Sequence, residues 1–573
     1  MTFSNIFFIS ILFLSSLKND PEDRSIFISP VKIPLSLSAN FGELRIDHFH
    51  SGLDIKTQGV TGKEVVAAAN GYVYRISVSP GGFGKAVYIR HPSGYSTVYA
   101  HLDRFIPEIE EYVRNYQYER ESYLVSIFPS RDKFPVEQGD LIAYSGNSGS
   151  SSGPHLHYEI RKSESEIPVN PLIFEFGTGD DIGPVFERLA IYPVNKNTRI
   201  NGRNSVRKIN VAGGHGNYYI PLENEIRISG AAGFGIKSYD LLNDSYNRCA
   251  VYSIELRIDS ITRYKYVMDE FSFSESRYIN SHIDYETYLR EKTYFERTYI
   301  LPNNRLSAYS KTINKGVFNF IDNKKHHVEI EICDAHNNRS ILTFNVTSQL
   351  PSSMPEPDQV ENGLITMPYN RTNRFRAENL SVTIPAGALY DTLLFSYKKA
   401  PGTPEMLSDV HYIHNKYTPV HRSFSLSIKP DRIPAGMESK LLIIQINNES
   451  APGALPGTIA DGFVNAEAMS FGMFYVGIDT VAPVISPNGL VSGADLTSRN
   501  EMRIRISDEL SGIKSYEPLV DGKWALFEYD PKNNVLVYRF DPERITKGAT
   551  HNLTLKVTDN TDNQSVFNCD FLW

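Results

Sequence analysis

Val65-Val-Ala-Ala-Ala-Asn-Gly71 is a short apolar run that ends in a turn, and two later runs share its pattern, Ala86-Val-Tyr-Ile-Arg-His91 and Leu141-Ile-Ala-Tyr-Ser-Gly146. Short runs between glycine-rich turns, with almost no helical periodicity, are typical of β-strands in a compact domain. We therefore predict an all-β domain over residues 26–176.

Residues 107–133 interrupt this series of predicted strands. The segment, PEIEEYVRNYQYERESYLVSIFPSRDK, is charged and aromatic, and its apolar residues lie near helical spacing. This pattern predicts an insertion that forms one short helix followed by a loop. Because the insertion follows soon after His101, we hypothesise that it lies near the cleft of any site that contains this histidine and gates or shapes it.

The length of the chain requires several domains. It has 573 residues, whereas single hydrophobic cores stop growing at about 250 to 300 residues, so we expect three to five domains. The 34 Tyr and 31 Phe favour sheet over helix. A net charge of -8 offers no basic field, which argues against nucleic acid as a partner.

The amino terminus reads as an export signal. Residues 1–18 are apolar and carry no charge until Lys18, and the run is too short for a comfortable membrane span. A retained anchor and a buried strand are the alternatives. We expect an exported protein of the periplasm or cell envelope, or a secreted one. Of the three cysteines, Cys249 and Cys333 could pair, or all three could be buried as small hydrophobic residues.

An internal repeat links residues 180–350 and 480–573. Gly235-Ile-Lys-Ser-Tyr-Asp240 matches Gly512-Ile-Lys-Ser-Tyr-Glu517, and Cys333-Asp-Ala-His-Asn-Asn-Arg-Ser340 aligns with Thr558-Asp-Asn-Thr-Asp-Asn-Gln-Ser565. Both copies resemble the immunoglobulin-like sandwiches of exported bacterial proteins. The Asp and Asn residues of the repeat turns could bind calcium, or they could serve only to bond their own backbone.

A third β segment, residues 355–478, lies between the two copies and contains Leu380-Ser-Val-Thr-Ile-Pro-Ala-Gly-Ala-Leu389. This segment looks like another sandwich module. The predicted fold class is therefore mainly β, with an N-terminal domain followed by three β-sandwich modules.

Five residues form the candidate site, and they occur in His50-Ser-Gly-Leu-Asp54, in Tyr99-Ala-His101-Leu102 and in Pro154-His-Leu-His-Tyr-Glu159. On an extended strand, residues two apart share a face, so His155 and His157 project to the same side. The same parity places His50 and Asp54 on one face, with only Gly52 between them.

A hydrolytic zinc site needs three His or carboxylate ligands and an open position for water. His50, Asp54 and one of the paired histidines meet this need. The other histidines would lie beside the metal, where they can take a proton or stabilise an oxyanion. Isolated histidines such as His91, His336, His411 and His421 are expected to be ordinary core or surface residues.

Residues 41–176 resemble the lysostaphin-like M23 zinc endopeptidases, whose pattern is His-x-x-x-Asp, a later Tyr-x-His-Leu and a terminal His-x-His. The resemblance implies an M23-type β barrel or sheet and a Zn²⁺ cofactor. It implies that His50, Asp54 and His157 are the zinc ligands. His101 and His155 would then be the catalytic residues, acting on the water and on the tetrahedral intermediate.

The function implied by this resemblance is hydrolysis of peptide cross-links or stem peptides in bacterial peptidoglycan. The β modules would hold the catalytic domain near the wall or near an envelope protein, or would act as a spacer. One alternative is a catalytically inactive peptidoglycan-binding protein or activator of wall hydrolases. Another, a biotinyl or lipoyl carrier, would need a lysine at a hairpin tip, and Lys85 lacks the flanking signature.

Overall fold

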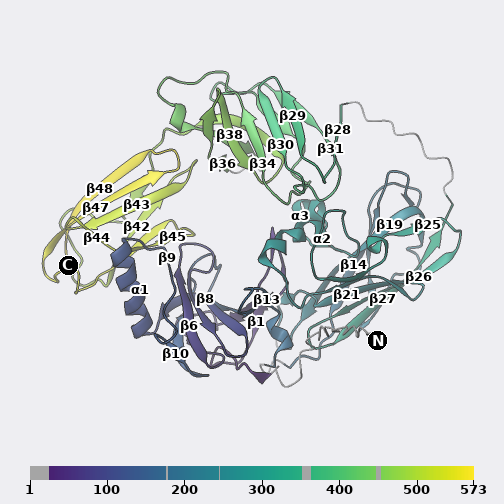
Figure 1. Cartoon of the computed structure of the whole chain (residues 1–573), viewed down its shortest axis with the longest axis horizontal. Coiled ribbons are helices and arrows are strands. Elements are labelled where there is room, and N and C mark those ends of the chain that lie inside the picture. The colour runs from purple at the N-terminus through teal and green to yellow at the C-terminus, as the bar shows by residue number, and fades with distance from the viewer. Residues whose placement is uncertain (1–24, 176–178, 244, 351–362, 447–452) are drawn as a thin grey trace, which may run out of the picture.

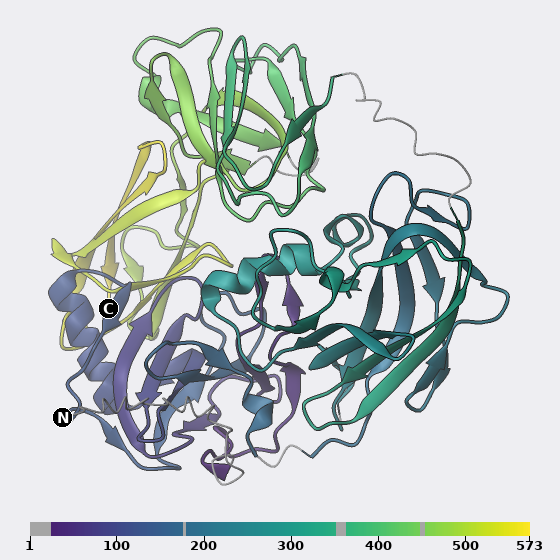
Figure 2. The same cartoon turned by 45° about the vertical axis from the view of Figure 1, so that its right-hand side comes forward.

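The computed structural model describes residues 25–175, 179–243, 245–350, 363–446 and 453–573 (Figure 1). The predicted export signal, residues 1–18, lies outside the described residues. Figures 1 and 2 show the elements arranged as a ring, in which the last strands of the chain return to the N-terminal domain. The fold is mainly β, as predicted.

An eleven-stranded sheet builds the N-terminal domain, and β12 lies at its centre between β4 and β8. The two ends of the strand path, β1 and β10, do not pair among the described residues, so the sheet is open and the expected barrel is not closed. Its strands are β1 (Leu37–Ala39), β4 (Leu53–Lys56), β5 (Glu64–Val66), β6 (Gly71–Val78), β7 (Lys85–Arg90), β8 (Tyr95–Phe105), β9 (Val125–Ile127), β10 (Pro135–Val136), β11 (Leu141–Ser145), β12 (His155–Lys162) and β13 (Pro168–Val169). A separate hairpin joins β2 (Leu44–Arg45) to β3 (His48–Phe49).

The central strands bury alternate apolar side chains on one face. Leu156, Tyr158 and Ile160 of β12 are fully buried, and they pack in one cluster with Ile55 and Tyr99. Each buried side chain of this size contributes about 1.5 to 3 kcal/mol. The opposite positions of β12 are therefore free to carry the histidines.

The insertion contains the helix α1 (Pro107–Arg120), which has proline in its first turn and ends at Glu121 in the left-handed conformation. Ile109, Val113 and Gln117 are buried at helical spacing, and the helix packs on β8 and β9. The segment after the helix was expected to be a loop, but it includes the strand β9, which pairs with β6.

Residues 185–348 form the second unit, a connected sheet of fourteen strands in which the long strand β19 pairs with several others. Its longer strands are β14 (Val185–Pro193), β16 (Arg207–Asn210), β19 (Ile226–Leu241), β21 (Ser253–Ile258), β22 (Ile261–Val267), β24 (Tyr309–Thr312), β26 (Lys325–Cys333) and β27 (Arg339–Ser348), and two helices follow β22, α2 (Ile279–His282) and α3 (Tyr285–Glu291). Phe41 and Phe49 of the N-terminal domain belong to the core cluster of this unit. The segment that carries His50 is therefore anchored in two cores.

The third unit and the C-terminal unit are each built around two larger sheets, and the third unit also has a two-stranded sheet of β28 (Ile365–Met367) and β31 (Leu393–Phe395). In the first of them, one five-stranded sheet includes β29 (Asn373–Ala377), β30 (Leu380–Ile384), β34 (Phe424–Ile428) and β38 (Phe463–Ala468), and the other includes β33 (Val410–Ile413), β35 (Leu441–Ile446) and β39 (Gly472–Ile478). The C-terminal unit has a four-stranded sheet with β42 (Glu501–Ser507), β45 (Phe527–Asp530) and β46 (Val535–Arg539), and a five-stranded sheet with β43 (Ile513–Val520), β47 (Thr550–Asp559) and β48 (Gln564–Leu572). Each unit has its own core.

The C-terminal unit docks on the N-terminal domain, which closes the ring (Figures 1 and 2). The aromatic ring of Tyr118 in α1 packs edge-on against Trp524, with 5.2 Å between the ring centroids, and the Arg544 guanidinium lies over the Tyr118 ring. Lys85 is buried against Glu528, with 3.3 Å between Nζ and Oε2. A buried, paired Lys85 does not suit the lysine of a carrier domain.

The three cysteines are free thiols, so the possible pairing of Cys249 with Cys333 is not made. Among the described helices, we find none with the length and hydropathy needed to cross a bilayer.

Candidate metal centre

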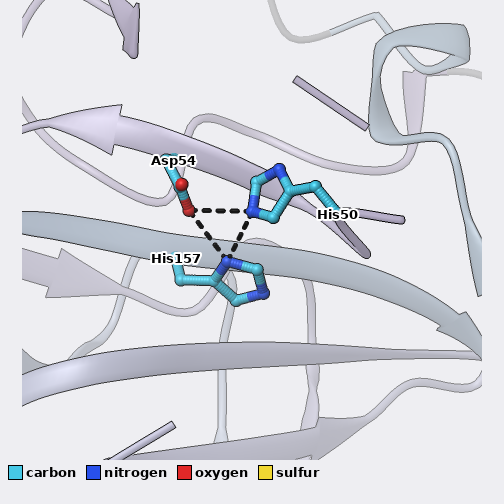
Figure 3. A group of neighbouring side chains, drawn as sticks. All are labelled: His50, Asp54 and His157. Atoms are coloured by element: carbon cyan, nitrogen blue, oxygen red, sulfur yellow. Dashed lines mark hydrogen bonds and ion pairs between the residues drawn. The ribbon is translucent and has the colours of Figure 1, made fainter. Parts of the chain in front are cut away.

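Three side chains converge on one point of the N-terminal sheet (Figure 3). His50 Nε2 lies 3.0 Å from Asp54 Oδ1 and 3.0 Å from His157 Nδ1, and His157 Nδ1 lies 2.9 Å from Asp54 Oδ1. All three residues are buried. The structure thus brings together the three residues that were predicted as zinc ligands.

Strand pairing sets these positions. His157 of β12 lies directly opposite Asp54 of β4, so their side chains share one face of the sheet. The backbone of His50 bonds to Gly42 and Glu43, and the Phe49 amide donates to Ser276 Oγ of the second unit. Two units of the chain therefore fix the approach of His50.

The outer hydrogen bonds leave one nitrogen of each histidine free to face the centre. His50 donates from Nδ1 to the Asn40 carbonyl (2.7 Å), and His157 donates from Nε2 to Glu159 Oε1 (2.9 Å). Because these oxygens can only accept, the proton lies on the outer nitrogen, and a lone pair points inward. Asp54 Oδ2 accepts from Arg45 at 2.8 Å.

This donor set fits a Zn²⁺ ion. Ligand bonds of about 2.0 Å in a tetrahedral arrangement place ligand atoms about 3.3 Å apart, close to the separations observed here. His50 Nε2, His157 Nδ1 and Asp54 Oδ1 all present lone pairs to the same point, because the proton of each histidine lies on its outer nitrogen. A cation at the point of convergence satisfies all three.

His101 and His155 lie beside this point. His101 donates from Nδ1 to the Ser148 carbonyl (2.9 Å), and His155 donates from Nδ1 to the Gly153 carbonyl (2.8 Å). Their rings are 4.8 Å apart, and His155 Nε2 is 3.4 Å from Asp54 Oδ1. Each therefore has its Nε2 available on the same side of the sheet.

Burial and neighbouring side chains together set the protonation of the site. Desolvation, with the nearby charges of His157 and His155, lowers the pKa of His101 to about 3, so this imidazole is neutral near pH 7. Desolvation also lowers the pKa of His50. Burial opposes ionisation of Asp54, but His50 and the hydrogen bonds from His155 and His157 hold the pKa of this carboxyl well below its usual range.

Sequence reasoning missed the outer partners of the ligands. Glu159 is fully buried and also bonds to Arg161 and to Ser51 Oγ. Its position two residues after His157, on the same face of β12, was the available signal. The Asn40 and Ser148 contacts come from backbone carbonyls, and the sequence carried no signal for them.

The other histidines lie elsewhere. His91 is buried in the N-terminal domain and bonds to the Asn70 carbonyl and to Thr97, while His411 and His421 lie in the third unit. His336 belongs to a separate group with Asp180 and Asp334. The helix α1 makes its contacts with β8, β9 and the C-terminal unit.

The open sheet thus presents a His, Asp and His donor set that could hold a metal ion, with two further histidines beside it. The family model of peptidase family M23 matches residues 48–118 and 125–171, and a Zu5-like domain model matches residues 365–479. The chain belongs to peptidase family M23 through its N-terminal domain.

Three curated proteins are similar to this domain. An uncharacterized metalloprotease of Haemophilus influenzae is 33% identical over 22% of this chain and 20% of its own length. The DD-carboxypeptidase/endopeptidase Mpg of Neisseria meningitidis is 35% identical over 22% of each chain. Lipoprotein NlpD of Yersinia enterocolitica is 31% identical over 20% of this chain and 91% of its own length. The chain thus spans about a fifth of the length of the first two relatives.

Proposed function

We propose that this protein is a zinc-dependent endopeptidase that hydrolyses peptide cross-links or stem peptides of bacterial peptidoglycan. The observation that carries the proposal is the convergence of His50 Nε2, Asp54 Oδ1 and His157 Nδ1 within 3.0 Å of one another. The similarity to the endopeptidase Mpg supports the choice of substrate. The catalytic module would span residues 26–176, with β modules at 180–350, 355–478 and 480–573.

In this proposal, His50, Asp54 and His157 would hold Zn²⁺, and the bound ion would supply Lewis-acid chemistry for the scissile carbonyl and the attacking water. His101 is neutral near pH 7, with its Nε2 lone pair available, so it can accept the proton of the attacking water. It can then return that proton to the leaving amine. His155, held through Nδ1 by the Gly153 carbonyl, can stabilise the developing oxyanion in its imidazolium form, in which Nε2 also carries a proton to donate.

The second candidate function is an inactive wall-binding protein or an activator of other wall hydrolases. The relative named lipoprotein NlpD favours it, and a match named murein hydrolase activator NlpD points the same way. Against it stands the full set of three ligands and two further histidines in this chain.

Loss of turbidity of purified peptidoglycan, with and without a chelator, separates the two functions. We expect chelator-sensitive release of peptides by the wild-type chain and none by His155→Ala. His327→Ala, which changes an exposed histidine of the second unit, is the matched control and retains activity. Wall binding without released peptides would favour the activator. Mass spectrometry of the products identifies the bond that is cut.

The β modules are proposed to place the catalytic domain near the wall or near an envelope protein. Export to the periplasm or cell envelope is part of the same proposal, supported by residues 1–18 and by the lipoprotein relative. Fractionation of cells that produce a tagged chain tests this location.

A further inference from the structure

An arginine-rich pocket lies on the N-terminal domain beside the second unit. Its volume is about 610 Å³, within the range of ligand pockets in proteins. The sheet contributes Arg75, Arg90 and Arg161, the insertion contributes Phe128 and Arg131, and the second unit contributes Phe273. These six residues define what we call the arginine pocket. None of them is a predicted zinc ligand or catalytic residue.

The arginine pocket has an excess of positive charge. Its lining holds four arginines but one carboxylate, that of Glu166, which pairs with Arg161. Among the residues that the structure describes, Arg75, Arg90 and Arg131 form no ion pair; their contacts are with hydroxyl, carbonyl and aromatic groups. The chain as a whole is acidic, with a net charge of -8. The pocket is therefore a local positive field that favours an anionic ligand.

Aromatic rings orient three of these guanidinium groups. Arg75 lies over Phe128, Arg90 over Tyr74 and Arg131 over Tyr72, at 5.7, 4.8 and 5.4 Å from the ring centroids. Stacking of this kind uses the flat face of a guanidinium and leaves N–H groups at its edge able to donate. Those N–H groups match the two oxygens of a carboxylate, which guanidinium groups bind in a bidentate manner.

The pocket also offers apolar surface. The side chain of Phe128 is 67% exposed and that of Phe273 is 46% exposed, and both belong to the lining. Exposed aromatic rings beside unpaired arginines suit a ligand that has apolar as well as acidic groups. A peptide that carries a carboxylate has both.

Strand β12 connects the arginine pocket to the metal centre. Glu159 accepts hydrogen bonds from His157 Nε2 and from Arg161 Nε, and the three residues occupy alternate positions on one face of the strand. The Phe83 ring also contacts both ends, since it stacks on His157 with 5.2 Å between centroids and lies 5.8 Å from the Arg161 guanidinium. Four residues of strand span about 13 Å, so an extended peptide with its scissile bond at the metal centre would reach the pocket about four residues away.

We infer that the arginine pocket binds a carboxylate of the peptide substrate, about four residues from the bond that is cut. This inference rests on the proposed peptidase function and narrows its substrate class to peptides with a free carboxylate at that distance. Arg75 and Arg131 are the specificity-determining residues, because both are free of ion pairs and neither bonds to a metal ligand. Arg131 and Phe128 come from the insertion, which thereby takes part in substrate selection.

Binding to the full chain with His155→Ala, which we expect not to hydrolyse peptides, tests the pocket without catalysis. The ligands are soluble stem-peptide fragments of purified peptidoglycan, either unmodified or with their carboxylates converted to amides. Calorimetry should show that the unmodified fragments bind at least about five-fold more tightly. Arg75→Gln or Arg131→Gln, each added to His155→Ala, should remove most of this preference. Arg120→Gln, which changes an exposed arginine stacked over Tyr116 outside the pocket, is the matched control and should keep it.

Steady-state kinetics of the active chain show whether the pocket serves the reaction. Arg75→Gln and Arg131→Gln should each raise KM for the unmodified fragments about five-fold and leave kcat unchanged, because the pocket does not touch the reacting bond. An unchanged KM in both variants would overturn the inference. Because Arg131 is exposed, loss of folding does not explain an effect of Arg131→Gln.

Two further results would overturn the inference. One is equal binding of amidated and unmodified fragments, and the other is a preference for unmodified fragments that persists in both arginine variants. Displacement of the fragments by inorganic phosphate, without any preference for carboxylate over amide, would be a case of the first and would indicate a phosphate-bearing ligand. Absence of hydrolysis by the wild-type chain, with the carboxylate preference intact in calorimetry, would refute the peptidase function and leave the pocket as a peptide-binding site.

Discussion

Glu159 shows how a residue outside the ligand set can control the metal centre. Its carboxylate accepts hydrogen bonds from His157 Nε2 and from Arg161. Burial acts to raise the pKa of this carboxyl, but Arg161 and His157 outweigh burial and lower the pKa to about 2. A charged acceptor of this kind fixes the ring of a ligand histidine and increases its basicity. Glu159 is a positioning residue, since it touches the ligand rather than the metal.

Glu159→Gln should weaken zinc binding about 10- to 100-fold, because the acceptor of His157 loses its charge. Competition between the protein and a chelator of known affinity measures this change. Glu166→Gln is the matched control, since Glu166 also bonds to Arg161 but not to a ligand histidine. Equal zinc affinity in Glu159→Gln and wild type would contradict the positioning role.

At the scale of single residues, strand parity predicted that His155 and His157 share a face, but it left open which of the two joins His50 and Asp54. Only the resemblance to the M23 endopeptidases selected His157. His50 lies between β3 and β4, so strand geometry alone does not explain its position. The carbonyls of Asn40, Ser148 and Gly153, which set the histidine tautomers, could not be predicted. Every residue has a backbone carbonyl, so only the folded path of the chain selects these three.

Gly52 connects the residue scale to the packing of strands. An added Cβ at this position would lie 2.3 Å from the carbonyl oxygen of Tyr158 in β12, so no side chain fits between the two strands. Gly52 also separates His50 from Asp54 in the sequence. Close approach of β4 and β12 is therefore required for the ligands to converge.

Gly52→Ala should force β4 away from β12, abolish zinc binding and lower the free energy of unfolding by about 1 to 3 kcal/mol or more, in the range of overpacked cores. Metal analysis and denaturant unfolding measure these changes. In the control Gly214→Ala, the added Cβ meets no atom within 4 Å, and stability should stay within about 1 kcal/mol of wild type. A zinc-loaded Gly52→Ala variant would argue against close strand packing as the reason for glycine here.

The helix α1 is an element whose existence, but not whose role, could be predicted from sequence. The helical spacing of Ile109 and Val113 predicted a helix, and both residues are buried against the N-terminal domain. The strand β9 was not predicted, because a strand of three residues is too short to show the alternation of apolar and polar residues. The other face of α1 meets Trp524 and Arg544, and no local pattern identifies a partner that far along the chain.

Tyr118→Ala should loosen the C-terminal unit from the N-terminal domain. It removes an aromatic contact with Trp524 and a cation-π contact with Arg544, together worth about 1 to 2 kcal/mol. Hydrogen exchange of α1 and of β45 should become faster, while the core strands of each unit keep their protection. Tyr118→Phe, which retains the aromatic ring, serves as the control. Unchanged hydrogen exchange in Tyr118→Ala would show that this contact does not hold the C-terminal unit against the N-terminal domain.

At the scale of the whole molecule, the contact of the C-terminal unit with the N-terminal domain reaches the loop beside His101 and His155. Lys532 of the C-terminal unit donates from Nζ to the carbonyls of Asn147 (2.6 Å) and Ser151 (2.9 Å). Between these two residues lies Ser148, whose carbonyl orients His101, and Ser151 Oγ lies 3.1 Å from His155 Nδ1. The loop that positions both histidines is therefore held from the far end of the chain.

Lys532→Ala should reduce kcat about five-fold, because it removes about 1 kcal/mol of bonding to this loop. Zinc content and KM should change little, since the ligands are held by β4 and β12. Lys532→Arg should recover most of the activity, and Lys514→Ala, which breaks an exposed ion pair with Asp562, should have no effect. Steady-state kinetics on peptidoglycan fragments measure all four chains, and an unchanged kcat in Lys532→Ala would remove the role assigned to this contact.

The mainly β character of the whole chain could be predicted from its composition and its strand-like runs, but the ring could not. Lys532 and Ser151 are separated by 381 positions, and a contact of this kind depends on the shapes of all the units between them. The hypothesis that the insertion gates the cleft rested on chain proximity alone, and it stays a prediction. The described contacts of α1 are with β8, β9 and the C-terminal unit.

The two partners of the Lys532 contact are also synthesised at different times, because they lie far apart in the chain. A ribosome that adds about 5 to 20 residues per second needs about 20 to 80 s to travel the 381 positions between the two halves of this contact. The M23 domain is thus synthesised complete with its five site residues well before Lys532 exists. A polypeptide that stops before Lys532 would carry all five site residues and still lack the two hydrogen bonds that hold the loop beside His101 and His155.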